Sequence, residues 1–255
     1  MKKLALLLAL ALSLCLLSAC GGGANPASDF EYRFNAAAGG VVITKYIGTS
    51  IHPKIPERIE GEPVVGIGEN AFSGSGIASI DIPTSVKEIG GVAFSGCDGL
   101  TSITLPDSVA IIGNGAFYRC NELTSITIPD SVTEIGERAF TECSKLIEIT
   151  IPDSVTRIEY GAFSDCDALT SITIPDSVTS IENFAFFGCD ALTNITIPSS
   201  VTEIGNNAFG WCTGLTRINV PDSVSSISRG AFYGCSYDLI ITYKGKDYTE
   251  YEFAS

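Results

Sequence analysis

Three residue types recur along most of this chain with a step of 23 residues. The positions are 83, 106, 129, 152, 175, 198 and 221 for proline, 97, 120, 143, 166, 189, 212 and 235 for cysteine, and 94, 117, 140, 163, 186, 209 and 232 for phenylalanine. Self-similarity at a fixed period of about 20–50 residues is typical of repeat architectures. The spacing therefore predicts a stack of equal units, in which each unit contacts only its neighbours.

The first half of each unit predicts a strand followed by a turn. Residues 123–145 read L-T-S-I-T-I-P-D-S-V-T-E-I-G-E-R-A-F-T-E-C-S-K. Ile126 and Ile128 alternate with polar residues, so both side chains are expected on one face of a short strand. Pro129 follows the strand, where its missing N–H does least harm. Asp130 and Ser131 favour a turn because their side chains can bond nearby backbone N–H groups.

The second half of the unit supplies the remaining interior residues. Val132 and Ile135 bracket a second short extended piece, while Ala139 and Phe140 are expected inside, and Cys143 is a small, soft apolar filler. A single unit offers about six apolar side chains, which is too few to form a core alone, but stacked units form a continuous one. The predicted fold class is thus mainly β, a solenoid of about eight turns built from short strands and turns.

The unit pattern L-x-x-I-x-I-P-x-S-V-x-x-I-G-x-x-A-F-x-x-C, from about Val41 to the end of the repeats, resembles the BspA-like family of bacterial surface leucine-rich-repeat proteins. The period of 23 lies within the leucine-rich-repeat range of about 20–29 residues. The departures from the pattern spare the apolar positions: Thr84, Ser199, Glu159, Glu182 and Ser228. The resemblance implies a leucine-rich-repeat solenoid that works in adhesion and is not an enzyme.

The N-terminus has the form of an export signal. Lys2 and Lys3 precede an apolar run from Leu4 to Leu17, and Leu17-Ser18-Ala19-Cys20 follows. This is typical of a secretory signal peptide, which is too short to span a bilayer. The last four residues resemble the lipobox of bacterial lipoproteins, which implies lipidation of Cys20 and a bacterial protein anchored at the cell surface. The alternative is an ordinary cleaved signal peptide with a coincidental cysteine.

The period and its interruptions divide the chain into five parts. We expect a lipoprotein signal peptide at 1–19, a glycine-rich flexible tether at 20–27, an N-terminal cap at 28–62, the solenoid at 63–235 and a C-terminal cap at 236–255. Solenoid ends need polar covers, because an open edge can pair with another chain.

Composition argues against several classes of function. The formal net charge is −14, which is unfavourable for nucleic acid or for an anionic membrane surface. The predicted contact with the membrane is therefore through the lipid alone. The single histidine, His52, lies in the cap without a nucleophile motif near it, so we predict no enzyme activity, no cofactor and no metal site.

Two columns of residues invite a chemical interpretation. The periodic cysteines could form a redox or metal ladder, but all seven share one context and none lies in a C-x-x-C motif, so we predict buried thiols. An aspartate column could bind calcium, although turn formation explains it equally well. Its members are Asp107, Asp130, Asp153, Asp176 and Asp222.

Large aromatic residues occupy variable positions near the repeated Ala-Phe pair. Tyr160, Phe184, Phe187 and Trp211 fall on three consecutive turns and form the predicted ligand-binding residues. Aromatic anchors of this kind are frequent interface hot spots, and the alternative is that they fold inward to fill gaps. The predicted function is recognition of an extracellular protein of a host, matrix or neighbouring cell, and the alternative is a glycan ligand.

Overall fold

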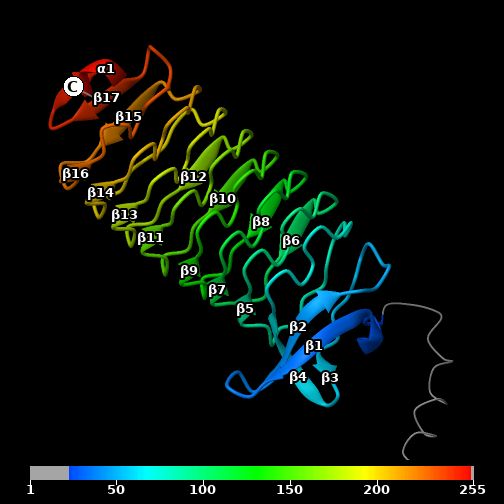
Figure 1. Cartoon of the computed structure of the whole chain (residues 1–255). Helices are drawn as coiled ribbons and strands as arrows, with labels where there is room; N and C mark the ends of the chain where they lie inside the picture. Colours follow the sequence, from blue (N-terminus) through cyan, green and yellow to red (C-terminus); the bar gives the residue numbers. More distant parts are fainter. Residues whose placement is uncertain (1–22, 254–255) are drawn as a thin grey trace, which may run out of the picture.

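The chain forms a rod of stacked turns, as Figure 1 shows for the computed structural model, which describes residues 23–253. There are about nine turns with a spacing of about 23 residues, so the predicted mainly β solenoid is confirmed. The signal peptide and Cys20 lie outside the described residues. Over residues 23–253, no helix has the length and apolar character needed to cross a bilayer.

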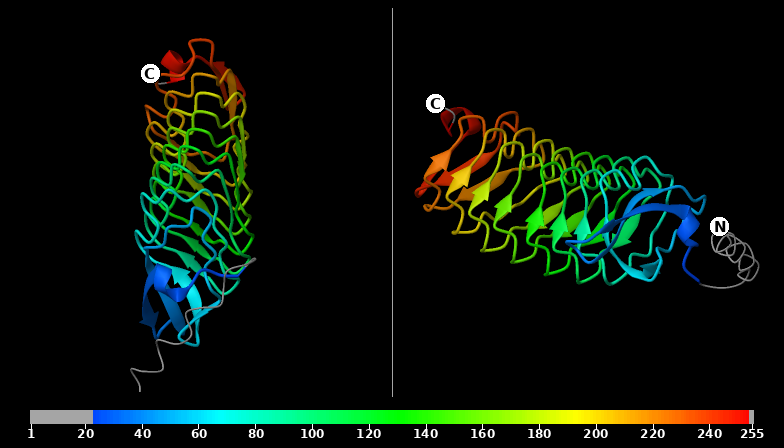
Figure 2. Two further views of the ribbon diagram at one scale, coloured as in Figure 1. Left: turned by 90° about the vertical axis from the view of Figure 1, so that its right-hand side faces the viewer. Right: turned by 60° about the horizontal axis from the view of Figure 1, so that its bottom comes forward.

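Two columns of short strands run along the rod (Figure 2). The first column comes from the L-x-x-I-x-I segments: β6 (Ser102–Thr104), β8 (Ser125–Thr127), β10 (Glu148–Thr150), β12 (Ser171–Thr173), β15 (Arg217–Val220) and β17 (Ile240–Tyr243). The second begins with β2 (Gly40–Tyr46) and β4 (Glu62–Ile67) and continues through the segments after each repeat proline: β5 (Glu88–Ile89), β7 (Ile111–Ile112), β9 (Glu134–Ile135), β11 (Arg157–Ile158), β13 (Ser180–Ile181), β14 (Glu203–Ile204) and β16 (Ser226–Ile227).

Strands of neighbouring turns pair in parallel, with equivalent residues opposite one another. Ile103 of β6 pairs with Ile126 of β8, and Ile149 of β10 pairs with Ile172 of β12. Ile126 and Ile128 are both buried, as the alternation of apolar and polar residues predicted. Because the period is constant, the inward-facing apolar residues of each unit lie over those of the next and form a continuous column.

The serine that follows each proline-aspartate step forms a hydrogen bond to the neighbouring turn. The sequence predicted instead a bond to the backbone of its own turn. Ser131 Oγ donates to the carbonyl oxygen of Val109 at 2.6 Å, and Ser177 Oγ makes the same bond to Val155. The hydroxyl is half-buried and faces the preceding turn, where a backbone carbonyl needs a donor. The serine thus ties successive turns together.

The third side of each turn contains the buried phenylalanine. Here the backbone donates forward, as in the 2.9 Å bond from Phe140 N to the carbonyl oxygen of Ala162. From Phe72 to Phe232, successive rings lie 5.2–5.6 Å apart and within 19° of parallel. Close ring contacts contribute about 0.5–1.5 kcal/mol beyond the area they bury, so this stack is a main source of cohesion along the rod.

The seven periodic cysteines are buried, as predicted. Each thiol lies within hydrogen-bonding distance of a phenylalanine carbonyl of the preceding turn. The distance is 3.2 Å from Cys166 Sγ to the carbonyl oxygen of Phe140. Burial raises the pKa of every one of these thiols, to about 11 for Cys97 and to about 12 for Cys235. The neutral thiol is therefore the stable form in the folded protein.

Both ends of the rod are covered. At the N-terminal end, a 3-10 turn (Ala27–Asp29) leads into β1 (Phe30–Asn35), which pairs antiparallel with β2, while β3 (Arg58–Ile59) pairs antiparallel with β4. Because β2 itself pairs in parallel with β4, the ladder reaches into residues 28–62. At the other end, β18 (Lys246–Tyr248) pairs with β17, and α1 (Glu250–Phe253) sets Phe253 edge-on against Phe232.

Candidate binding surface

From Phe72 to Phe209, the loop around each buried phenylalanine passes twice through left-handed backbone, two residues before the ring and two residues after it. Several turns place glycine at these positions, such as Gly161 and Gly188. Other turns place larger residues there, such as Val92 and Arg138, and so do the turns that contain Phe184, with a φ of 59°, and Trp211, with a φ of 57°. A bulky residue in this region is unusual and costs about 1–3 kcal/mol. The left-handed backbone belongs to the repeat itself, and what distinguishes Phe184 and Trp211 is the large ring that each carries there.

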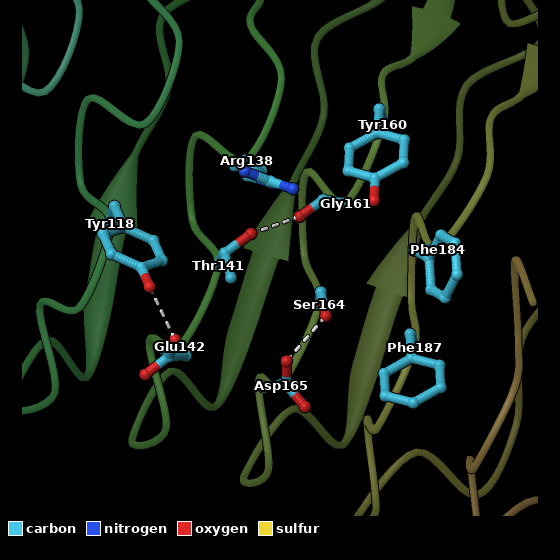
Figure 3. Close-up of a pocket in the computed structure, with 10 residues that line it drawn as sticks. All are labelled: Tyr118, Arg138, Thr141, Glu142, Tyr160, Gly161, Ser164, Asp165, Phe184 and Phe187. Atoms are coloured by element: carbon cyan, nitrogen blue, oxygen red, sulfur yellow. Dashed lines mark hydrogen bonds between the residues drawn. The ribbon is translucent and has the colours of Figure 1, made fainter.

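A trough of about 360 Å³ lies on this side of the rod, and Figure 3 shows its lining. Four residues that each follow a buried phenylalanine shape its length: Tyr118, Thr141, Ser164 and Phe187. The two aromatic residues close the ends, while the two small residues are buried and form the floor. Thr141 Oγ1 donates to the carbonyl oxygen of Gly161 at 2.6 Å, which fixes the floor in place.

One long wall of the trough is aromatic. The guanidinium carbon of Arg138 lies 5.0 Å from the centre of the Tyr160 ring. The Tyr160 and Phe184 rings lie 5.6 Å apart at 55°, and Phe184 and Phe187 lie 5.5 Å apart at 59°. All three rings are half-buried, so each offers one part to the packing and another to the trough. The predicted alternatives, exposed anchors and inward gap-fillers, are both partly realised.

The opposite wall carries two carboxylates, Glu142 and Asp165. Tyr118 Oη and Arg119 Nε each donate to Glu142, at 2.8 Å. The bond from Arg119 lowers the pKa of the Glu142 carboxyl, and the bond to Glu142 raises the pKa of the Tyr118 phenol. Asp165 accepts a bond from Ser164 Oγ at 2.7 Å. This wall therefore presents carboxylate oxygens that neighbouring side chains hold in place.

The structure thus brings together Tyr160, Phe184 and Phe187, but not Trp211. The Trp211 ring is 49% exposed, lies 6.4 Å from the Tyr233 ring and does not line the trough. Sequence reasoning missed Arg138, Glu142 and Asp165. One signal was available: the residue after the repeated phenylalanine is small in two consecutive turns and aromatic in the turns on either side.

The other candidate groups form no comparable site. His52 is exposed, with its Nδ1 2.8 Å from Ser79 Oγ in the N-terminal part of the chain. The five aspartates of the repeated column, for which calcium binding was the alternative to turn formation, are exposed. Among the residues from 23 to 253, no three His, Cys, Asp or Glu side chains lie close enough together to hold a metal ion. A hollow of about 380 Å³ near the C-terminal end also combines aromatic and charged residues, among them Arg229, Tyr243 and Glu252, but the trough is the one that contains rings predicted from sequence.

Comparison with known proteins agrees with this architecture. A leucine-rich-repeat protein from T. pallidum is 34% identical, with a TM-score of 0.72, over 76% of this chain and 91% of its own. A leucine-rich cell surface protein from Faecalibacterium prausnitzii is 31% identical, with a TM-score of 0.63, over 88% of this chain and 77% of its own. A leucine-rich-repeat protein from Bacteroides ovatus is also 31% identical, with a TM-score of 0.63, over 84% of this chain and 66% of its own.

A comparison with curated proteins gave no match. The family model described as the BspA type leucine-rich-repeat region matches this chain in six copies, over residues 65–191 and 145–254. These residues contain both strand columns from β5 onward, the phenylalanine stack and the trough. The chain therefore belongs to the BspA-type leucine-rich-repeat family.

Proposed function

We propose that this chain is a cell-surface adhesion protein, held at the membrane by a lipid on Cys20, and that its aromatic trough binds a component of host, matrix or neighbouring-cell surfaces. One observation carries the proposal: the rings of Tyr160, Phe184 and Phe187 form one wall of a trough whose floor consists of small residues. Solenoids commonly bind through such extended surfaces.

Surface location is supported by family membership and by the F. prausnitzii relative, which is described as a cell surface protein. The Leu-Ser-Ala-Cys sequence ending at Cys20 supports the lipid anchor. The trough carries the chemistry of a binding site, since pockets of about 300–1,000 Å³ with aromatic walls and a few polar groups typically hold ligands.

The test compares binding of the purified mature chain with that of variants to immobilised matrix proteins and to cell-surface glycans. Replacing Phe187 by alanine removes one end of the trough and should weaken binding by about 1–3 kcal/mol, or roughly fivefold to 150-fold. The matched control is Tyr233→Ala, which removes an exposed ring at the same repeat position outside the trough. Equal binding by wild type and Phe187→Ala, with both folded, would refute the proposed role of the trough.

A further inference from the structure

We infer that the ligand of the trough is a neutral oligosaccharide of about three sugar rings that lies along the axis of the rod. This inference rests on the proposed function and names the class of molecule that the same site takes. Four features of the trough support it: its charge balance, its mixture of hydrogen-bonding groups, the placement of its rings and its length.

Charge around the trough is balanced, unlike that of the whole chain, whose formal charge is −14. Glu142 is paired with Arg119, and Asp165 and Arg138 bring one further charge of each sign. Within the described part of the chain, Arg138 has no ion-pair partner and sits over the Tyr160 ring. Arg138 would repel a cationic peptide, and the carboxylates of Glu142 and Asp165 would repel an anionic chain. A neutral ligand meets neither penalty.

The polar groups suit a ligand that carries many hydroxyls. The guanidinium of Arg138 can only donate, while the carboxylates of Glu142 and Asp165 can only accept. A sugar hydroxyl does both, so a ring with several hydroxyls can bond to the two long walls at once. A purely apolar ligand would leave these groups without partners, at a cost of about 1–3 kcal/mol for each buried group.

The aromatic side chains suit the flat, C–H-bearing face of a sugar ring. Tyr118 and Phe187 close the two ends, and Tyr160 and Phe184 line one side (Figure 3). Ring faces are electron-rich and attract the weakly positive C–H groups of a pyranose. Rings that already contact one another lose little conformational freedom when a ligand binds, which favours affinity.

The length of the trough sets the length of the ligand. Tyr118 and Phe187 stand three turns apart, so the strand spacing of about 4.8 Å separates them by about 15 Å. Each sugar residue lengthens an extended glycan by a distance close to the rise of one turn along the axis of the rod. Three rings therefore fill the trough. A neighbouring hollow of about 380 Å³ shares Tyr118 and Arg138 with the trough, so Tyr118 separates the two.

The variant that tests the inference uses the chain's own repeat. Ser164→Tyr places an aromatic residue where the equivalent positions of other turns hold Tyr118, Phe187 and Tyr233, so the backbone of the repeat is compatible with the change, and the new ring fills the floor of the trough. Phe187→Ala opens the trough instead, and Tyr233→Ala is the control. Circular dichroism and thermal unfolding establish that each variant is folded.

The experiment is calorimetric titration with cello-, xylo-, manno- and chito-oligosaccharides of increasing length, together with an oligolysine peptide. We expect at least one neutral series to bind, with affinity rising up to the trimer. Ser164→Tyr and Phe187→Ala should each weaken binding at least tenfold, and Tyr233→Ala less than twofold. Because the ligand is uncharged, raising the salt from about 0.05 M to about 0.5 M should change the affinity little.

Two results would overturn the inference in different ways. If no neutral series binds at millimolar concentration, but the peptide or an immobilised matrix protein binds and Ser164→Tyr abolishes this, the trough is a binding site for another class of ligand. The proposed function then stands, and the glycan assignment falls. If a glycan or protein binds and neither Ser164→Tyr nor Phe187→Ala changes its affinity, both fall.

Discussion

The left-handed positions of the solenoid can be tested with two glycines that differ mainly in backbone conformation. Gly74 and Gly76 are both exposed, and a methyl group added to either would meet no atom within 4 Å. Gly74 has a φ of 65°, whereas Gly76 lies outside the left-handed region. Replacing each by alanine therefore changes the conformational term without changing the packing.

The expected difference follows from two opposing effects. At Gly76, alanine restricts the unfolded chain and should stabilise the protein by about 0.4–1 kcal/mol. At Gly74, the left-handed conformation costs an L-residue about 1–2 kcal/mol, which exceeds that gain. Gly74→Ala should therefore be about 1–2 kcal/mol less stable than Gly76→Ala. Urea unfolding followed by circular dichroism measures the difference from the shift in midpoint at constant slope.

The same reasoning applies in reverse to the aromatic residues at these positions. Trp211→Gly and Trp211→Ala both remove the ring, but only glycine relieves the left-handed strain, so the glycine variant should be the more stable by about 1 kcal/mol. If Gly74→Ala is as stable as Gly76→Ala, and the two Trp211 variants unfold together, then the left-handed backbone carries no strain. The non-glycine residues at the other left-handed positions, Phe184 among them, would then carry no energetic penalty either.

Three further predictions concern the core and the anchor. Burial raises the pKa of the seven thiols in the folded protein above the value of about 8.5 in the unfolded chain. Above about pH 9, only the unfolded chain therefore releases these protons. The free energy of unfolding should fall as the pH rises, by up to about 1.4 kcal/mol per pH unit for each thiol. Urea midpoints between about pH 7 and 10 measure this fall, and Cys166→Ala should reduce its slope by one proton, whereas an unchanged slope would contradict it. Phe140→Ala and Phe163→Ala should each cost about 3–5 kcal/mol and be non-additive when combined, because the two rings lie 5.5 Å apart, while additive effects would show that the stack is not coupled. Finally, Cys20→Ala should move the mature protein from the detergent phase to the aqueous phase or leave it unprocessed, and a wild-type protein that carries no lipid would contradict the predicted anchor.

Much of the candidate site could not be predicted from sequence, because it depends on which residues of different turns face one another. Tyr160, Phe184 and Phe187 were identified because they break the repeat pattern. Trp211 breaks it equally, yet it lies beside Tyr233 and outside the trough. Arg138 and Asp165 carry no signal in an acidic chain, and only their placement around a floor of small residues distinguishes them.

The sequence by itself determined the period, the fold class, the inward residues and the burial of the cysteines. The reason is physical: a 23-residue repeat places equivalent residues over one another, so the pattern of one unit specifies every contact along the axis. Only the tertiary structure decided how the irregular residues combine. Side chains that lie 23 residues or more apart in the chain become neighbours across turns, and a trough forms where Thr141 and Ser164 are small between Tyr118 and Phe187. The trough is formed by residues of several turns together, so the sequence of a single unit does not predict it.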